Sequence, residues 1–147
     1  MHAVQLDTTH LPQRLNVLLV DDDPADRLLA EEAFSEYAGV VTVHTSPDGP
    51  AALAALHDPQ RPLPDVVILD LNMPEMNGFE VIAAIRSAAR TRHLPVVILS
   101  TSDRSQDVAR AYDLLASSYM VKSRDFPGFV KQIEHFVHFW YDCRFAR

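Results

Sequence analysis

Polar residues with three kinds of chemistry stand directly after four short apolar runs. They are the acids Asp21, Asp22 and Asp23 after residues 15–20, Asp70 after 66–69, the hydroxyls Ser100 and Thr101 after 96–99, and Lys122 after 119–121. Carboxylates without a matching histidine or cysteine spacing suit a hard cation, and Mg²⁺, which keeps several waters, suits a shallow site. An aspartate can attack phosphorus, and a lysine can grip phosphate oxygens. The residue types therefore indicate a site for a divalent cation and a phosphoryl group.

The three consecutive aspartates have different expected roles. Proline favours the first position of a helix, so Pro24 places Asp23 at the N-cap, where its side chain accepts from free backbone N–H groups. Asp21 and Asp22 then lie close to Asp70 if the two runs are neighbouring strands. Carboxylates that close raise one another's pKa values and repel unless a cation compensates. Acids at a helix start are usually caps, but capping does not explain Asp70.

The elements that must position these residues alternate between short apolar runs and stretches with helical spacing. The apolar runs are 15–20, 40–43, 66–69, 96–99 and 119–121, and the helical stretches are 30–37, an alanine-rich segment from Pro50, 78–85, 108–115 and a last helix from near Asp125. Most runs are continuously apolar, as expected for parallel strands covered on both faces. The pattern predicts an α/β fold, a doubly wound five-stranded parallel sheet with helices on both faces. Ligands of such sheets bind outside the carboxyl ends of the strands, where the polar residues fall.

Composition and charge narrow the classes of function. Hydrophobic residues make up 48% of the 147 residues and charged residues 22%, so we expect one folded domain, residues 15–147, behind a flexible leader, residues 1–14. A formal net charge of -7 and a pI near 5.4 argue against direct binding of nucleic acid. The single cysteine, Cys143, cannot form an internal disulfide, and no signal segment or run of ~20 apolar residues occurs. We therefore expect a soluble cytoplasmic protein with no membrane contact.

Four motifs resemble those of two-component response-regulator receiver domains. They are "LLVDDDP", "DVVILDLNMPEMNGFE", "LPVVILST" and "YMVKS", in the order and at roughly the separations that the family uses. The match covers nearly the whole chain from Leu15 onward. The resemblance implies the flavodoxin-like receiver fold with strand order 2-1-3-4-5, and a signalling role rather than that of an enzyme.

The resemblance also implies a role for each site residue. Asp70 is the phosphoacceptor, Asp21, Asp22 and Asp70 hold Mg²⁺ together with the backbone carbonyl of Asn72, Lys122 contacts the phosphate, Ser100 and Tyr119 form the switch, and Pro74 and Gly78 shape the loop after Asp70. A histidine kinase would supply the phosphoryl group. Ser100 would then approach the phosphate and vacate space into which Tyr119 turns. The readout surface would lie on the fourth helix, fifth strand and fifth helix.

One position departs from the family pattern. Ser123 follows Lys122, where the family normally has a proline, often in a cis bond. A cis bond without proline costs ~3 kcal/mol or more, so we expect either a rearranged loop or contacts that hold the strain. Together with the ending "FVHFW", the segment "VKSRDF" resembles small stand-alone receivers that partner bacterial phytochromes. This narrower resemblance implies a bacterial phytochrome as the kinase.

The final helix carries more aromatic residues than one core face requires. They are Phe136, Phe139, Trp140 and Tyr141, all within six residues. They could simply cover the sheet, but exposed apolar stripes usually mark interfaces. We therefore expect a homodimer through this helix.

Two other functions stay open beside the phosphoacceptor. A small phosphatase with an aspartate nucleophile would need a second acid two residues after it, where Asn72 stands, and a cap over its substrate. A receiver-like interaction module would keep the fold without taking phosphate. Labelling of Asp70 by a small phosphodonor with Mg²⁺ separates this module from a phosphoacceptor.

Overall fold

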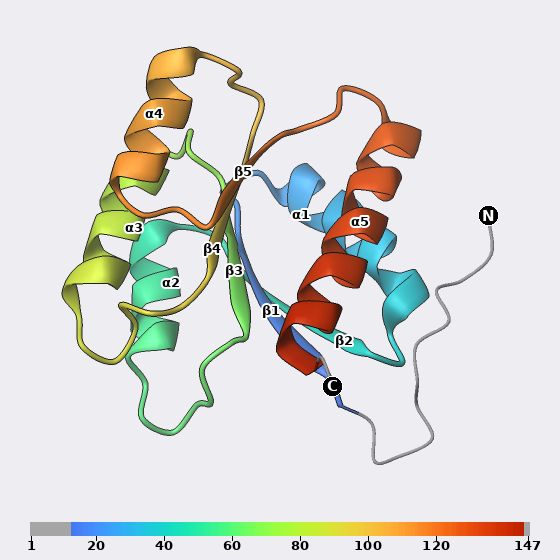
Figure 1. Cartoon of the computed structure of the whole chain (residues 1–147), viewed down its shortest axis with the longest axis horizontal. Helices are drawn as coiled ribbons and strands as arrows, with labels where there is room; N and C mark the ends of the chain where they lie inside the picture. Colours follow the sequence, from blue (N-terminus) through green and yellow to red (C-terminus); the bar gives the residue numbers. More distant parts are fainter. Residues whose placement is uncertain (1–12, 146–147) are drawn as a thin grey trace.

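A five-stranded parallel sheet forms the centre of the molecule (Figure 1). The computed structural model describes residues 13–145, and its strands are β1 (Leu15–Val20), β2 (Val41–Ser46), β3 (Val66–Leu69), β4 (Val96–Ser100) and β5 (Ser118–Val121). They lie in the order β2-β1-β3-β4-β5, and each neighbouring pair is parallel. The predicted doubly wound sheet with strand order 2-1-3-4-5 is confirmed.

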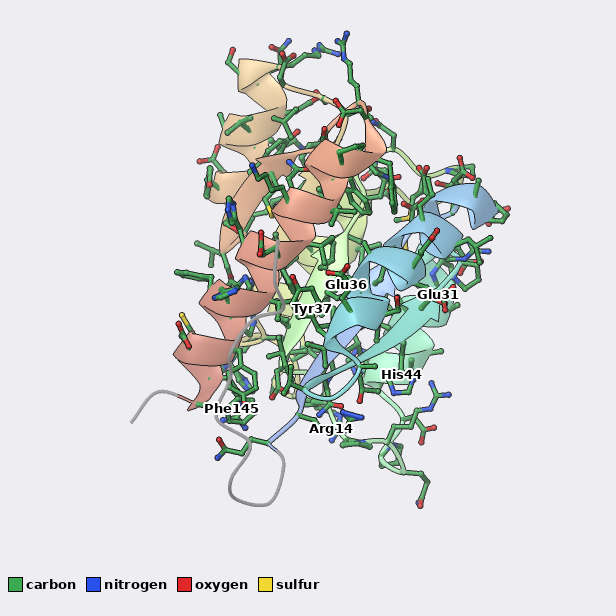
Figure 2. All side chains as sticks on the ribbon, turned by 90° about the vertical axis from the view of Figure 1, so that its right-hand side faces the viewer. Arg14, Glu31, Glu36, Tyr37, His44 and Phe145 are labelled. Atoms are coloured by element: carbon green, nitrogen blue, oxygen red, sulfur yellow. The ribbon has the colours of Figure 1, made fainter. Side chains whose placement is uncertain are left out.

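Helices cover both faces of this sheet. They are α1 (Pro24–Phe34), the short 3-10 helix η1 (Ser35–Tyr37), α2 (Gly49–Leu56), α3 (Gly78–Ser87), α4 (Ser105–Asp113) and α5 (Phe126–Phe145). Figure 1 shows α1 and α5 on one face and α2, α3 and α4 on the other. Figure 2, which looks onto the first face, shows α1 and α5 side by side with Tyr37 between them.

The strands feed two separate cores because successive side chains point to opposite faces. In β3, Val66 and Ile68 join the core under α1 and α5, while Val67 and Leu69 join the core under α2, α3 and α4. All four side chains are buried. A strand covered on both faces therefore appears in the sequence as an unbroken apolar run that ends where burial ends.

Polar caps start three helices beside the carboxyl ends of the strands. Asp23 caps α1, with its Oδ1 accepting from the backbone N–H two residues further on at 2.9 Å, which confirms the prediction made from the proline that follows it. Asp48 caps α2. Asn77 caps α3 and forms a capping box with Glu80. Each helix therefore has a defined first residue close to the same edge of the sheet.

Several predicted boundaries shift in the structure: the helix predicted over 108–115, for example, spans Ser105–Asp113. Two other shifts have a clear physical reason. β2 extends to Ser46 rather than ending at residue 43, because it is an edge strand whose partly exposed polar residues hide its continuation from an apolar pattern. The first helix ends at Phe34, and Tyr37, predicted at its core face, is buried from the 3-10 turn that follows. Such turns are common at helix ends.

Residues 1–12 of the predicted leader lie outside the described residues, as do residues 146–147 of the predicted domain. Arg14, the last residue of that leader, donates two hydrogen bonds of 2.8 Å to the Ala38 carbonyl. Within residues 13–145, none of the helices has both the length and the apolar character that crossing a membrane requires.

Candidate functional site

Strand pairing brings the predicted residues to one edge of the sheet. The ladder continues one residue beyond β1, β3 and β5, because the backbone N–H groups of Asp21, Asp70 and Lys122 donate to the last carbonyls of β2, β1 and β4. These bonds measure 3.2, 3.0 and 2.8 Å respectively. Ser100 is itself the last residue of β4. The backbone of each residue is therefore placed by the sheet and not by a free loop.

Three carboxylates form a cluster at this edge, which we call the acid cluster. Asp21, Asp22 and Asp70 each place one oxygen so that the three atoms lie within 4.8 Å of one another. Asp21 is only 4% exposed, and the other two acids are half-buried. Asp23 turns away to cap α1. The structure therefore divides the three consecutive aspartates as predicted, with two at the site and one at the helix.

Burial and crowding raise the pKa values of two acids in the cluster. Burial first, and then the charge of Asp21, raise the pKa of Asp70 from 3.8 to about 6, against the hydrogen bond from Asn72 and the charge of Lys122, which lower it. Burial also raises the pKa of Asp21, although the Asp23 N–H and the lysine oppose this. Burial, with like charge added to it, thus disfavours the ionised acids more than their hydrogen bonds and Lys122 compensate. The all-oxygen donor set of the acid cluster fits a hard divalent cation.

Lys122 lies against the acid cluster. Its Nζ is 3.0 Å from Oδ2 of Asp26 and 3.6 Å from Oδ2 of Asp21. It also lies 5.8 Å from the centre of the Phe129 ring, within range of a cation–π contact. Burial alone would lower the pKa of this lysine, but the hydrogen bond to Asp26 and the charges of the neighbouring acids, Asp70 included, raise it overall. The ammonium group is therefore charged and held beside the carboxylates.

The segment after Lys122 avoids the strain that a cis bond without proline would impose. Every peptide bond within residues 13–145 is trans, including the bond to Ser123. Gln132 of α5 holds the segment, because its Oε1 accepts from the Ser123 N–H at 2.9 Å and its Nε2 donates to the Val121 carbonyl at 2.6 Å. Contacts from α5 thus stand where the family normally has a proline.

Sequence reasoning missed two residues around Lys122. Asp26 binds its ammonium group from α1, 96 positions away, and Gln132 binds the neighbouring backbone from α5. Nothing local in the sequence links either residue to the lysine. The one available signal was the place of Asp26 in the first turn of a helix that starts at the acid cluster.

Hydrogen bonds connect the two predicted switch residues. Ser100 is fully buried, and its Oγ accepts from the Ser102 N–H at 3.1 Å. The Tyr119 hydroxyl donates to the Ser102 carbonyl at 2.8 Å, and its ring packs half-buried on the core under α2, α3 and α4. The Ser102 hydroxyl donates to Asp107 at 2.6 Å. Any movement of the Ser100 side chain therefore bears on Tyr119 through Ser102.

The loop between β3 and α3 passes close to Asp70. A β-carbon at Gly78 would lie 2.5 Å from the Asp70 carbonyl oxygen and 2.8 Å from Cα of Leu71. Asn72 donates its N–H to Oδ1 of Asp70 at 3.3 Å. The predicted part of Gly78 in shaping this loop therefore has a steric basis, since a larger residue would push α3 away from the site.

The predicted interface on α5 needs correction for two of its four aromatic residues. Phe136 and Tyr141 are 3% and 6% exposed and belong to the core under α1 and α5. Phe136 packs edge-on against Phe34 of α1, with ring centres 5.9 Å apart. Because α5 faces both the sheet and α1, it buries a wider stripe than one core face needs. Phe139, 59% exposed, and the half-buried Trp140 stay at the surface.

Comparison with known sequences places the chain among signalling proteins. Residues 17–134 match the family described as "Response regulator receiver domain". The probable methanogenesis regulatory protein FilR2 of Methanothrix harundinacea is 35% identical over 127 residues, which cover 84% of this chain and 82% of FilR2. Response regulator Rcp1 of Synechocystis sp. is 34% identical over 128 residues, which cover 84% of this chain and 87% of Rcp1.

Solved structures of similar proteins share the fold. The crystal structure of the phosphorylated cyanobacterial phytochrome response regulator RcpA has a TM-score of 0.81 at 33% identity, and the match covers 88% of this chain and 96% of RcpA. The Mn²⁺-bound form of Rcp1 has a TM-score of 0.78 at 33% identity, with 85% of this chain and 93% of Rcp1 covered.

Proposed function

This chain belongs to the response regulator receiver domain family, and from that premise we propose that it accepts a phosphoryl group from a histidine kinase onto Asp70. One observation carries the proposal: Asp70 directly follows β3 and places an oxygen within 4.8 Å of oxygens of two further carboxylates, at the edge where the Lys122 ammonium also lies. A nucleophile, an oxygen donor set and a positive charge thus meet in a half-buried site that a donor can approach.

The proposed transfer forms one P–O bond and breaks one P–N bond. An oxygen of Asp70 attacks phosphorus in line with the bond to the kinase histidine, whose nitrogen leaves with the electron pair. With a pKa of about 6, Asp70 is mostly ionised near neutral pH and keeps its nucleophilic form. The charged Lys122 stabilises the equatorial oxygens during transfer.

The proposed cofactor is Mg²⁺, with Asp21, Asp22, Asp70 and the backbone carbonyl of Asn72 as its ligands. When bound, the cation would neutralise the carboxylates and polarise the phosphoryl oxygens. The all-oxygen donor set and the raised pKa values of Asp21 and Asp70 support this assignment. The Mn²⁺-bound form of Rcp1 gives support from a relative.

The proposed switch consists of Ser100 and Tyr119. An aspartyl phosphate, with about −1.5 to −2 charges, offers strong acceptors to the Ser100 hydroxyl. If Ser100 turns toward them, it gives up the bond from the Ser102 N–H and loosens the segment that holds Tyr119. The change would reach α4, β5 and α5, which we propose as the surface that a partner protein reads. The proposed output is therefore a protein contact and not catalysis. Its extent is limited by the difference in phosphate contacts between the two states.

Intact-mass analysis with acetyl phosphate and Mg²⁺ tests the proposal on wild type and Asp70→Asn. Here the P–O bond to acetate breaks and acetate leaves with the electron pair. A gain of one phosphate by wild type alone supports the proposal, and equal labelling of both removes Asp70 from its role. If neither protein is labelled and acetyl phosphate stays intact, the result supports the interaction module. If neither is labelled but acetyl phosphate is rapidly hydrolysed, the result supports the phosphatase.

We propose a phytochrome-type histidine kinase as the phosphoryl donor. We also propose that this transfer takes place in the cytoplasm. The similarity to RcpA, a phytochrome response regulator, supports the donor. The single cysteine supports the reducing compartment. Transfer from an autophosphorylated bacterial phytochrome should be faster than from an equally phosphorylated chemotaxis kinase. Equal rates would contradict the assignment of this donor.

A homodimer through Phe139 and Trp140 on α5 is also proposed. Their rings pack edge-on with centres 5.1 Å apart, and Phe139 is 59% exposed. Phe139→Lys should shift the chain toward monomer in sedimentation velocity. Leu28→Lys, at a leucine of α1 that is 68% exposed, is the matched control and should leave the dimer unchanged. A monomeric wild type would contradict the dimer.

A further inference from the structure

Gln132 of α5 binds the backbone on both sides of Lys122. Its Nε2 donates to the Val121 carbonyl at 2.6 Å, and its Oε1 accepts from the Ser123 N–H at 2.9 Å. β5 is an edge strand, and a parallel strand beside it would bind two such groups through one of its residues. The carboxamide of Gln132 therefore substitutes for one residue of a neighbouring strand.

Lys122 is held from the opposite side by β4. Its own N–H donates to the Ser100 carbonyl at 2.8 Å. One hydrogen bond from β4 and two from Gln132 thus surround a residue that lies just beyond the end of β5. Its side chain is a flexible four-carbon stem that reaches Asp26 and Asp21. Fixing the backbone at the base of this stem limits where its charge can go.

The contact depends on the residue that follows the lysine. A proline at position 123 would have no N–H for Oε1 of Gln132 to accept from. α5 also packs tightly on this segment, since a β-carbon at Gly128 would overlap the Ser123 hydroxyl. We infer that Gln132 is a positioning residue for phosphoryl transfer, which holds Lys122 at the acid cluster in place of a proline. The inference rests on the proposed acceptance of phosphate by Asp70.

The experiment compares Gln132→Met, which keeps the length of the side chain but loses both hydrogen bonds, with wild type. The control is Gln106→Met at an exposed position of α4. Labelling rates with acetyl phosphate and Mg²⁺ are measured by intact mass, in the wild-type and the Lys122→Ala backgrounds. Amide exchange of Ser123 reports the hydrogen bond directly. If Gln132→Met does not fold, Gln132→Ala, a strong helix former that also loses both hydrogen bonds, takes its place.

Gln132→Met should slow labelling about 10-fold in the wild-type background and change it less than about 2-fold in the Lys122→Ala background, because misplacement of one group by ~1 Å can cost up to 100-fold. Amide exchange at Ser123 should become faster in Gln132→Met and should stay as in wild type in the control Gln106→Met. An unchanged labelling rate in Gln132→Met, or the same slowing without Lys122, would overturn the positioning role while leaving the phosphoacceptor intact. A wild type that takes no phosphate would overturn the proposed function and this inference with it.

Discussion

β3 has an aspartate at each end, and the two are treated in opposite ways. Asp65, before the strand, accepts from the Asn16 N–H at 2.8 Å and from Nε of Arg144 at 2.7 Å. Asp70, after the strand, accepts from one backbone N–H at 3.3 Å and lies among other carboxylates. The neighbours of the aspartate therefore donate hydrogen bonds to it at one end of the strand and repel its charge at the other.

The difference separates an acid that stabilises the fold from one that the fold tolerates. Bonds to a carboxylate from a backbone N–H and a guanidinium are favourable for Asp65. Burial beside like charge makes ionised Asp70 unfavourable, as its raised pKa records. The strands beneath hold the crowded acids in place regardless, as the proposed binding of a cation and a phosphoryl group requires.

The largest expected effect is on phosphate uptake. Asp21→Asn should slow labelling by acetyl phosphate and Mg²⁺ on the order of 100-fold, because a bound metal contributes several kcal/mol of charge stabilisation that the amide would weaken. Asp65→Asn should stay within about 2-fold of wild type, since it keeps an acceptor for Asn16 and lies at the far end of β3. Intact mass against time measures both rates. Equal slowing by both substitutions would show that uptake reports general stability and would remove the contrast.

Stability should respond in the reverse order. Asp65→Ala should lower the free energy of unfolding by about 2 kcal/mol, because the Asn16 N–H and Arg144 lose a charged partner together. Urea unfolding followed by circular dichroism measures this. Asp70→Ala, at the other end of the strand, serves as the matched comparison and should cost much less. A larger loss at Asp70 than at Asp65 would contradict the assignment of Asp65 as the stabilising acid.

Asp70→Asn should stabilise the metal-free protein at about pH 7.5. The folded pKa of Asp70, about 6, lies above its ordinary 3.8, so the folded state binds the proton more tightly. The proton on Asp70 therefore stabilises the folded state fully below the ordinary pKa of 3.8, and this stabilisation is lost as pH rises through the folded pKa of about 6. Because the carboxylate is partly exposed to water, we expect the variant to gain about 1 to 2 kcal/mol above wild type.

Urea unfolding in the presence of a chelator, at several pH values, measures this gain. The gain should shrink toward zero as pH falls through the interval between the two pKa values. Added Mg²⁺ should narrow it near neutral pH by stabilising wild type more. A gain that stays constant with pH would show that the amide acts through packing and not through charge.

The sheet and the acid cluster could be predicted from sequence because the same rule sets both. A strand buried on two faces is continuously apolar, so the first polar residue after it, as at Asp21 and Asp70, marks the edge of the sheet. The rule fails at β2, where no strand within residues 13–145 pairs on one side and polar residues such as His44 are exposed within the strand. Boundaries were therefore predictable for central strands and not for this edge strand.

Contacts between distant segments could not be predicted in this way. Asp26 and Gln132 reach Lys122 and its backbone from two helices, and their places depend on how those helices pack on the sheet. The aromatic residues of α5 were assigned to an interface because one core face was assumed. The helix instead packs on α1 as well, which buries Phe136 against Phe34. The spacing of apolar residues along one helix does not tell which other helices it packs against.

The smallest expected effect divides the contribution of Asp65 between its two partners. Arg144→Gln should cost only about 0.5 kcal/mol, because the Arg144 side chain is 59% exposed and an exposed ion pair is weak. Raising the salt concentration should reduce this cost further, while the loss in Asp65→Ala should change little. Urea unfolding at low and high salt measures both. If Arg144→Gln instead costs as much as Asp65→Ala, the guanidinium and not the backbone of β1 holds this end of β3. The two ends of β3 would then differ in the source of the cation: Asp65 is paired with Arg144 of the same chain, whereas Asp70 takes its proposed Mg²⁺ from solution.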